Sequence, residues 1–118
     1  MSVTLHLVNF DKVYFHDGRG GKRLVTLSCY NVHLNGVTIG SVARQIVTRE
    51  QRTRGLQYVN RRWQAPAWTY GTSTGKYGSR LECLGRRDGI QRLLRDVLGD
   101  SPAQYEELAR TAVVVKDV

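Results

Sequence analysis

Hydrophobic and polar positions alternate along much of the N-terminal two thirds of the chain, which is the pattern of half-buried β-strands. The apolar residues Val3, Leu5 and Leu7 alternate with polar side chains, and this predicts a first strand. A β-prone segment follows at 13–15, before glycines and charged residues interrupt the pattern. The N-terminal strand is therefore expected to lead into a turn over 16–22.

The clearest local pattern is the pair Asn35-Gly36, which lies between two alternating runs. Both residues can adopt the positive φ angles of a type I′ turn, whose twist matches that of the flanking strands. A two-residue turn would place Leu34 opposite Val37 and Val32 opposite Ile39. One face of the predicted hairpin is then apolar along its length and is expected to lie in the core.

The second half of the predicted sheet has a less regular pattern. Gly40 is a candidate β-bulge, because the apolar positions after it change phase. Residues 48–62 carry many arginines and few apolar side chains, so they are expected to form an exposed loop or a frayed strand end. Short strands are predicted at 63–70, where Pro66 favours an edge position or a bulge, and at 79–84.

C-terminal to these strands the apolar period changes to that of an amphipathic helix. The positions that form one stripe at this spacing are Ile90, Leu93, Leu94, Val97 and Leu98. Gly99 suits the position that follows the helix. The segment 101–104 has the elements of a capping box, so a second helix is predicted to about Ala112. Residues 113–115 are expected to form a closing strand or a packed tail.

These elements predict one α+β domain that spans residues 1–118. Its mostly antiparallel sheet is expected to have about four to five strands, with two C-terminal helices packed on one face. A hydrophobic content of 41% and a charged content of 24% are ordinary for a globular domain. The chain is therefore expected to bury a core without a metal or a disulfide framework.

The cellular compartment is predicted from what the sequence lacks. The N-terminus has no basic region followed by an apolar run, and no stretch approaches membrane-spanning length. Cys29 and Cys83 lie far apart, without the spacing of a zinc site or a redox pair, and are expected to be buried free thiols. We therefore expect a cytoplasmic protein with no membrane contact.

The charge of the chain indicates an anionic partner. Eighteen Lys and Arg residues against ten Asp and Glu residues give a formal charge of +8. Nucleic acid, acidic lipid and an acidic protein surface all respond to such a field. Most of the basic residues are Arg, which favours planar and bidentate contacts to phosphate and bases, although a GC-rich genome also raises the Arg content.

The first candidate site is the cluster from Arg44 to Trp68, in which arginines lie among Tyr58, Trp63 and Trp68, a mixture that suits nucleic-acid binding. Its candidate contact residues are Arg44, Arg49, Arg52, Arg54, Arg61, Arg62, Trp68 and Tyr70. Because Trp63 and Trp68 are an odd number of residues apart in a strand, Trp63 is expected to be buried and Trp68 exposed. The alternative interpretation is a solvated basic loop beside two core tryptophans.

The second candidate site is the start of the first predicted helix, with Arg80, Arg86 and Arg87 as its contact residues. The amides at a helix N-terminus would add to the attraction for phosphate. The alternative is that Asp88 and Asp96 neutralise the helix arginines through pairs at helical spacing.

The sequence shows no pattern that is typical of an active site. His6, His16 and His33 lie in separate elements, and none is close in sequence to a candidate nucleophile. The acidic residues lack metal-ligand spacing, and the only carboxylates in or near the basic cluster are Glu50 and Glu82. We therefore predict a protein that is not an enzyme and that needs no metal and no cofactor.

Three segments together resemble the pattern of three strands and a helix in AP2-type and phage-integrase arm-binding domains, which is found in small proteins of actinobacterial phages and mobile elements. They are residues 35–42, residues 62–65 and residues 86–94. The resemblance implies a sheet that reads the DNA major groove, with contacts from Arg44, Arg61, Arg62, Trp68 and Arg80. The chain departs from this pattern in a long insertion at 48–60, in Gly89 where the family prefers Ala, and in an additional strand and helix at its ends.

The sequence thus predicts a small nucleic-acid-binding accessory protein, of phage or mobile-element origin, with duplex DNA as the favoured partner. One alternative is a protein-interaction module, such as a phage-encoded inhibitor of an acidic host protein. Another is an RNA-binding domain. A homodimer is compatible with the sequence.

Overall fold

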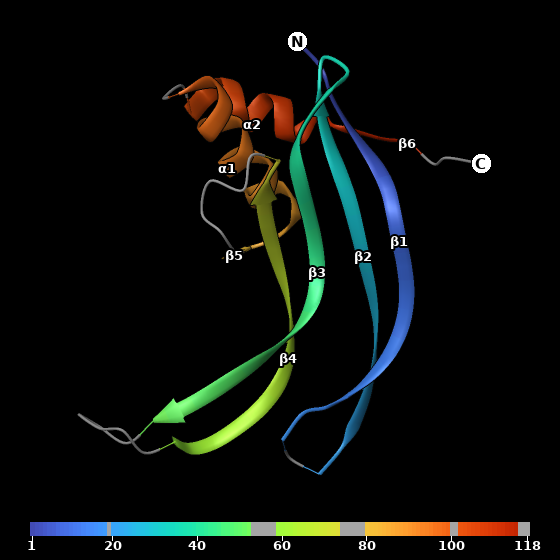
Figure 1. Ribbon diagram of the computed structural model, residues 1–118, viewed down its shortest axis with the longest axis vertical. Coiled ribbons are helices and arrows are strands. Elements are labelled where there is room, and N and C mark those ends of the chain that lie inside the picture. Colours follow the sequence, from blue (N-terminus) through green and yellow to red (C-terminus); the bar gives the residue numbers. More distant parts are fainter. Residues whose placement is uncertain (19, 53–58, 74–79, 100–101, 116–118) are drawn as a thin grey trace.

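The computed structural model describes residues 1–18, 20–52, 59–73, 80–99 and 102–115. Within these ranges the chain forms six strands and two helices, which confirms the α+β class (Figure 1). In chain order they are β1 (Val3–His16), β2 (Lys22–Leu34), β3 (Val37–Arg52), β4 (Val59–Thr72), β5 (Leu81–Cys83), α1 (Arg86–Leu98), α2 (Pro102–Arg110) and β6 (Val113–Val115).

The described strands form one sheet in the order β5-β4-β3-β2-β1-β6. All neighbours are antiparallel except β1 and β6, which run parallel. The sheet is mostly antiparallel, as predicted, but it has six described strands instead of about four to five, and its β1–β6 pair is parallel. The chain crosses from β5 through both helices before it returns beside β1, and such a long crossover permits a parallel neighbour.

The hairpin between β2 and β3 confirms the predicted turn. Asn35 and Gly36 have φ angles of 52° and 84°, as a type I′ turn requires. Leu34 pairs with Val37 as expected, but the next pairs are shifted, and Val32 lies opposite Gly40 instead of Ile39. The shift places an irregularity beside Gly40, where the phase change predicted a bulge.

Gly40 also lies where the sheet and α1 approach most closely. A Cβ atom at this position would collide with the carbonyl oxygen of Gly71 on β4 and would lie 2.6 Å from Leu93 Cδ2. Only glycine fits between these neighbours without a shift of the backbone.

The arginine-rich segment 48–62 was expected to be an exposed loop or a frayed strand end, and its described residues, 48–52 and 59–62, lie in strands. β3 continues to Arg52, β4 begins at Val59, and Glu50 pairs with Arg62 across the two strands. The backbone hydrogen bonds of an antiparallel pair form whatever the side chains are, so polar residues can extend a hairpin. β4 has an edge beyond its three pairs with β5, and Pro66 lies on this edge, as its missing N–H predicts.

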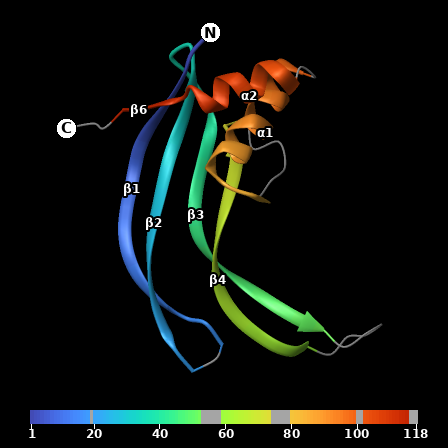
Figure 2. The same ribbon diagram turned by 180° about the vertical axis from the view of Figure 1, so that it is seen from behind.

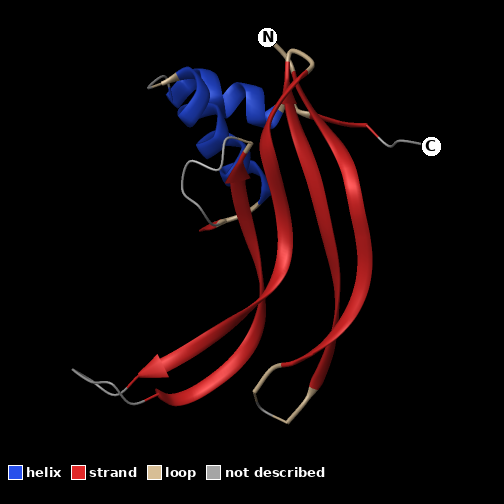
Figure 3. Ribbon diagram, in the orientation of Figure 1, coloured by secondary structure: helices blue, strands red, loops and turns tan. Residues whose placement is uncertain are grey.

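The main core lies at one end of the sheet, under the helices (Figure 3). α1 packs on β3 and β4, and α2 packs against α1. The buried apolar side chains of this core are Val3, Leu5, Val32, Leu34, Ile39, Val42, Tyr70, Ile90, Leu93, Leu94, Tyr105, Leu108 and Ala109. Of the predicted helical stripe, Val97 and Leu98 stay exposed. Tyr70, which was expected on the surface, is only 5% exposed and is part of the core.

The far end of the sheet is curled. The long strands all bend there in one direction, to the left in Figure 1 and to the right in the reversed view of Figure 2. β1 contacts β4, although two strands separate them in the sheet. Phe15 and Val25 are buried at this end. Gly18, with a φ of 77°, lies against β4 so closely that a Cβ there would be 2.6 Å from Trp63 Cβ.

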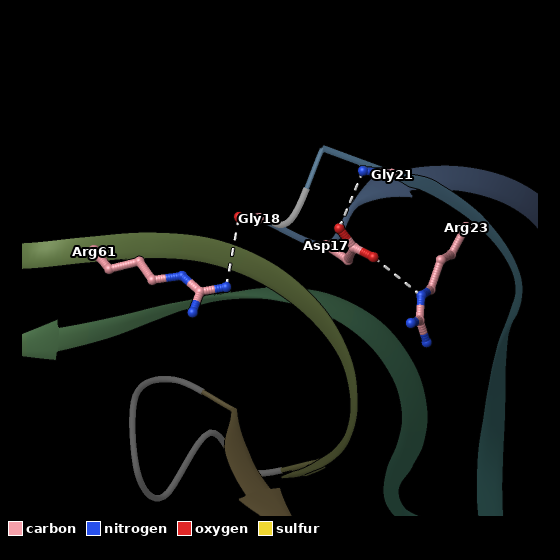
Figure 4. Close-up of polar contacts among 5 residues, drawn as sticks. All are labelled: Asp17, Gly18, Gly21, Arg23 and Arg61. Atoms are coloured by element: carbon pink, nitrogen blue, oxygen red, sulfur yellow. Dashed lines mark hydrogen bonds and ion pairs between the residues drawn. The ribbon is translucent and has the colours of Figure 1, made fainter.

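Polar contacts accompany this approach (Figure 4). Arg61 Nη2 lies 3.5 Å from the carbonyl oxygen of Gly18, which is a long and weak hydrogen bond. Asp17 accepts a hydrogen bond from the Gly21 N–H at 3.3 Å and pairs with Arg23 Nε at 3.1 Å. The tip of the first hairpin is thus placed beside the free edge of β4.

Candidate nucleic-acid interface

A first cleft lies between the tip of the β1–β2 hairpin and the edge of β4. Its volume is about 370 Å³, and its lining residues are Phe15, Asp17, Arg23, Arg61, Trp63, Gln64, Ala65 and Pro66. The guanidinium carbon of Arg61 lies 5.0 Å from the centroid of the Trp63 ring, which is a cation–π contact. This end of β4 therefore combines an aromatic ring with two arginines.

A second cleft lies where β5 ends and α1 begins. Its volume is about 480 Å³, and its lining residues are Arg44, Arg49, Pro66, Ala67, Trp68, Glu82, Cys83, Leu84 and Arg92. Arg44 and Trp68 are direct partners in the β3–β4 ladder, so their side chains project from the same face of the sheet.

A third, open cleft of about 560 Å³ surrounds the start of α1 and is lined by Leu84, Gly85, Arg86, Arg87, Asp88 and Gln91. It adjoins the second cleft at Leu84, and the second adjoins the first at Pro66. We name these three adjoining clefts the arginine track. Its described lining includes seven arginines and three carboxylates, which gives a net charge of +4.

Several of these arginines have acidic partners. Arg49 forms two hydrogen bonds with the carboxylate of Glu82, at 2.6 and 2.8 Å, and Arg92 pairs with Asp88 at 3.1 Å. On β4, Arg62 Nε pairs with a carboxylate oxygen of Glu50 at 3.0 Å. Two of the predicted contact residues, Arg49 and Arg62, therefore have their charges compensated by neighbouring carboxylates.

Other arginines of the track have no acidic partner among the residues that the structure describes. They are Arg44, Arg61, Arg86 and Arg87. The guanidinium carbon of Arg86 lies 5.4 Å from the centroid of the Tyr30 ring, which leaves its N–H groups available to an anion. These four side chains carry the uncompensated charge of the track.

Arg80 has a structural role in the described chain. Its guanidinium donates to Thr69 Oγ1 at 3.0 Å, to Ser41 Oγ at 2.6 Å and to the carbonyl oxygens of both residues at 3.2 Å. These bonds tie β3 to β4 and occupy the planar donors that a phosphate contact would need.

The structure thus brings together only part of the predicted site. The predicted residues that line the track are Arg44, Arg49, Arg61, Trp68, Arg86 and Arg87. Arg62 lines none of its three clefts, Arg80 is bound into the sheet, and Tyr70 is in the core. Arg54 and the side chain of Arg52 lie outside the described residues.

Trp63 and Trp68 are both half-buried, instead of one buried and one exposed. Each lines a different cleft, on either side of Pro66. Both rings therefore present part of their surface to the arginine track.

The sequence reasoning missed Arg23 and Leu84 as parts of this surface. Leu84 is 92% exposed between β5 and α1, whereas the alternation placed it at the end of a strand. Arg23 reaches the track only because the first hairpin curls toward β4. No local signal in the sequence reports such a curl.

Two other groups in the second cleft have shifted pKa values. Burial raises the pKa of the Cys83 thiol, which donates a 3.3 Å hydrogen bond to the carbonyl oxygen of Gly85. Tyr70 and Asp88 raise the pKa of the Arg92 guanidinium, so this side chain stays cationic. Cys29 and Cys83 are both free and half-buried, which is less burial than was expected.

The residues that the AP2-like pattern implies as contacts do not share one surface. Arg61 and Arg62 are consecutive in β4, so their side chains project from opposite faces, and Arg80 is engaged with Thr69 and Ser41. No protein-family model, curated protein or solved structure matches this chain. The resemblance therefore stays a prediction.

Two further findings concern the described part of the chain. Neither of its helices is long and apolar enough to cross a bilayer. Its His, Cys, Asp and Glu side chains form no group of three or more that could hold a metal ion.

Proposed function

We propose that this protein binds nucleic acid along the arginine track and performs no chemistry on it. The observation that carries the proposal is the continuity of the three clefts, whose described lining has a net charge of +4. A polyanion that lies along such a track releases condensed counterions, which is the main source of affinity in nonspecific nucleic-acid binding.

The side chains of the track suit this ligand better than a general anion. Arginine offers a planar fork that contacts phosphate oxygens in pairs and stacks on bases. Along β4, the stretch from Arg61 to Trp68 is about 23 Å long at the usual rise per strand residue. This length spans several nucleotides of a chain, whereas a small anion would need only one cleft.

DNA is the form of nucleic acid that the resemblance to AP2-type and arm-binding domains supports. In this proposal the protein is a small accessory factor of the cytoplasm, as in phages and mobile elements. The structure offers no common sheet face for the implied contacts, so this part of the proposal rests on the sequence pattern alone.

A titration of labelled oligonucleotides at several salt concentrations tests the proposal. We expect the logarithm of the binding constant to fall with the logarithm of the salt concentration, with a slope of about −3 to −4 for four net charges. A binding constant that does not change with salt, or no binding at low salt, would contradict it.

One observation favours a second function, which is docking to an acidic protein surface. Leu84 is 92% exposed in the middle of the track, and exposed apolar residues rimmed by charge are common at protein interfaces. In that case the purified protein would carry no nucleic acid, and its ratio of absorbance at the nucleic-acid and protein maxima would not change after a high-salt wash. Loss of nucleic-acid absorbance in the wash supports the first function instead.

A further inference from the structure

We infer that the arginine track takes a single-stranded nucleic acid, with its bases turned toward the protein and stacked on tryptophan. This inference rests on the proposed function and names the form of its ligand.

Both tryptophans of the chain line the track. Trp63 and Trp68 line adjoining clefts and are five residues apart on β4, which is about 17 Å along the strand. In a duplex the faces of the bases are hidden in the stack, and they become available to aromatic side chains only in an unpaired strand. Because Trp63 and Trp68 are an odd number of positions apart, their rings project from opposite faces of β4. They therefore suit two unstacked bases of a flexible single strand that passes around the edge of β4 at Pro66.

The guanidinium carbon of Arg61 lies over the Trp63 ring, 5.0 Å from its centroid. A guanidinium plane held on an aromatic ring is itself a platform on which a base can stack. The Trp63 ring needs no direct exposure for this contact, since the outer face of Arg61 continues the stack.

The uncompensated charges of the track lie on both faces of the sheet. Arg61 projects from one face of β4, Arg44 projects from the other face beside Trp68, and Arg86 and Arg87 follow at the start of α1. A ligand that contacts all four must follow a path around the edge of β4 at Pro66. A duplex presents two phosphate backbones, whereas a single strand presents one that can follow this path.

Leu84 is 92% exposed where the second and third clefts meet. An apolar side chain among arginines gains nothing from phosphate, but it gains contact area from the face of a base. Leu84 therefore suits a base that points inward at this junction.

The experiment compares three probes of about 12 nucleotides, a length within the range that single-strand sites occupy. The probes are oligothymidine, oligouridine and a mixed-sequence DNA duplex. The chain has only two tryptophans, and both line the track, so their fluorescence reports stacking directly. We expect one or both single strands to quench this fluorescence and to bind more tightly than the duplex.

Variants separate stacking from charge. Trp68→Leu should weaken single-strand binding by about 5- to 150-fold, which is the value of one base–aromatic stack. Phe10→Leu is the matched control, because Phe10 is 57% exposed on β1 and lines none of the clefts described above. If Trp68→Leu fails to fold, Leu84→Ser replaces it, since a side chain that is 92% exposed adds little to the fold.

The outcomes distinguish this inference from the proposed function. Tighter binding of either single strand, with quenching, supports the inference and identifies the sugar that the track prefers. Salt-dependent binding in which the duplex binds as tightly as the single strands, or in which the Trp68 and Leu84 variants bind like the parent protein, overturns the inference alone. If none of the three probes binds in a salt-dependent manner, the proposed function is overturned.

Discussion

The pairing of Arg49 with Glu82 leads to a direct prediction about the charge of the arginine track. Glu82 accepts two hydrogen bonds from the Arg49 guanidinium, at 2.6 and 2.8 Å, in the second cleft. The substitution Glu82→Gln removes the negative charge and leaves Arg49 in place. The track then has one more uncompensated cation, and a nucleic acid can use it for one more phosphate contact.

The expected magnitude follows from the exposure of the pair. The side chains of Arg49 and Glu82 are 41% and 46% exposed, so their pairing contributes only about 0.2–1 kcal/mol to stability and the variant should fold. One additional phosphate contact makes the log–log salt slope more negative by about 0.7 for a single strand or about 0.9 for a duplex. Between about 50 and 200 mM salt, the affinity should therefore fall about threefold more than in the parent protein.

The assay is the salt titration, and the chain offers a matched control. Glu107 on α2 accepts two 2.7 Å hydrogen bonds from Arg110, and these side chains are 61% and 58% exposed. Glu107→Gln changes the net charge by the same amount but lies outside the three clefts. If both variants steepen the slope equally, the protein binds by its total charge, and the assignment of the track is refuted.

Three further substitutions test the fold by urea denaturation. Gly40→Ala should lower the free energy of unfolding by about 1–3 kcal/mol because its Cβ has no space, whereas Gly85→Ala enters open space and should change it by less than about 0.5 kcal/mol. Tyr105→Phe should raise the free energy of unfolding by about 1 kcal/mol, because the buried hydroxyl has no hydrogen-bond partner in the described chain. A decrease would imply that an ordered water bonds to this hydroxyl. Arg80→Lys should lower the free energy of unfolding by about 1–3 kcal/mol, because it keeps the charge but loses the planar donors. It should not change the salt slope of nucleic-acid binding, and a changed slope would show that Arg80 contacts the ligand.

Elements that depend on local sequence were predictable. The type I′ turn follows from the positive φ angles that Asn35 and Gly36 tolerate, and α1 follows from an apolar stripe with a helical period. The edge position of Pro66 follows from its missing N–H. In each case the physical cause lies within a few residues of the position predicted.

Features that depend on partners distant in sequence were not predictable. The segment 48–62 was expected to be an exposed loop or a frayed strand end, because it has no apolar alternation. Its described strand residues are held by pairing between β3 and β4 and not by an apolar face. Arg49 meets Glu82 only through the fold, across 33 positions of the chain. Arg80 and Tyr70 were predicted as contact residues from their positions in the chain, whereas tertiary contacts bury Tyr70 and bind Arg80 to Ser41 and Thr69.

The central claim is that nucleic acid lies along the arginine track. Photocrosslinking of a bound oligonucleotide, followed by identification of the crosslinked peptides, tests it most directly. The account predicts crosslinks at Trp63, at Trp68 and in the segment 84–87. Phe10 and Tyr14 are 57% and 70% exposed on β1 and line none of the three clefts, so crosslinks concentrated there would contradict the account.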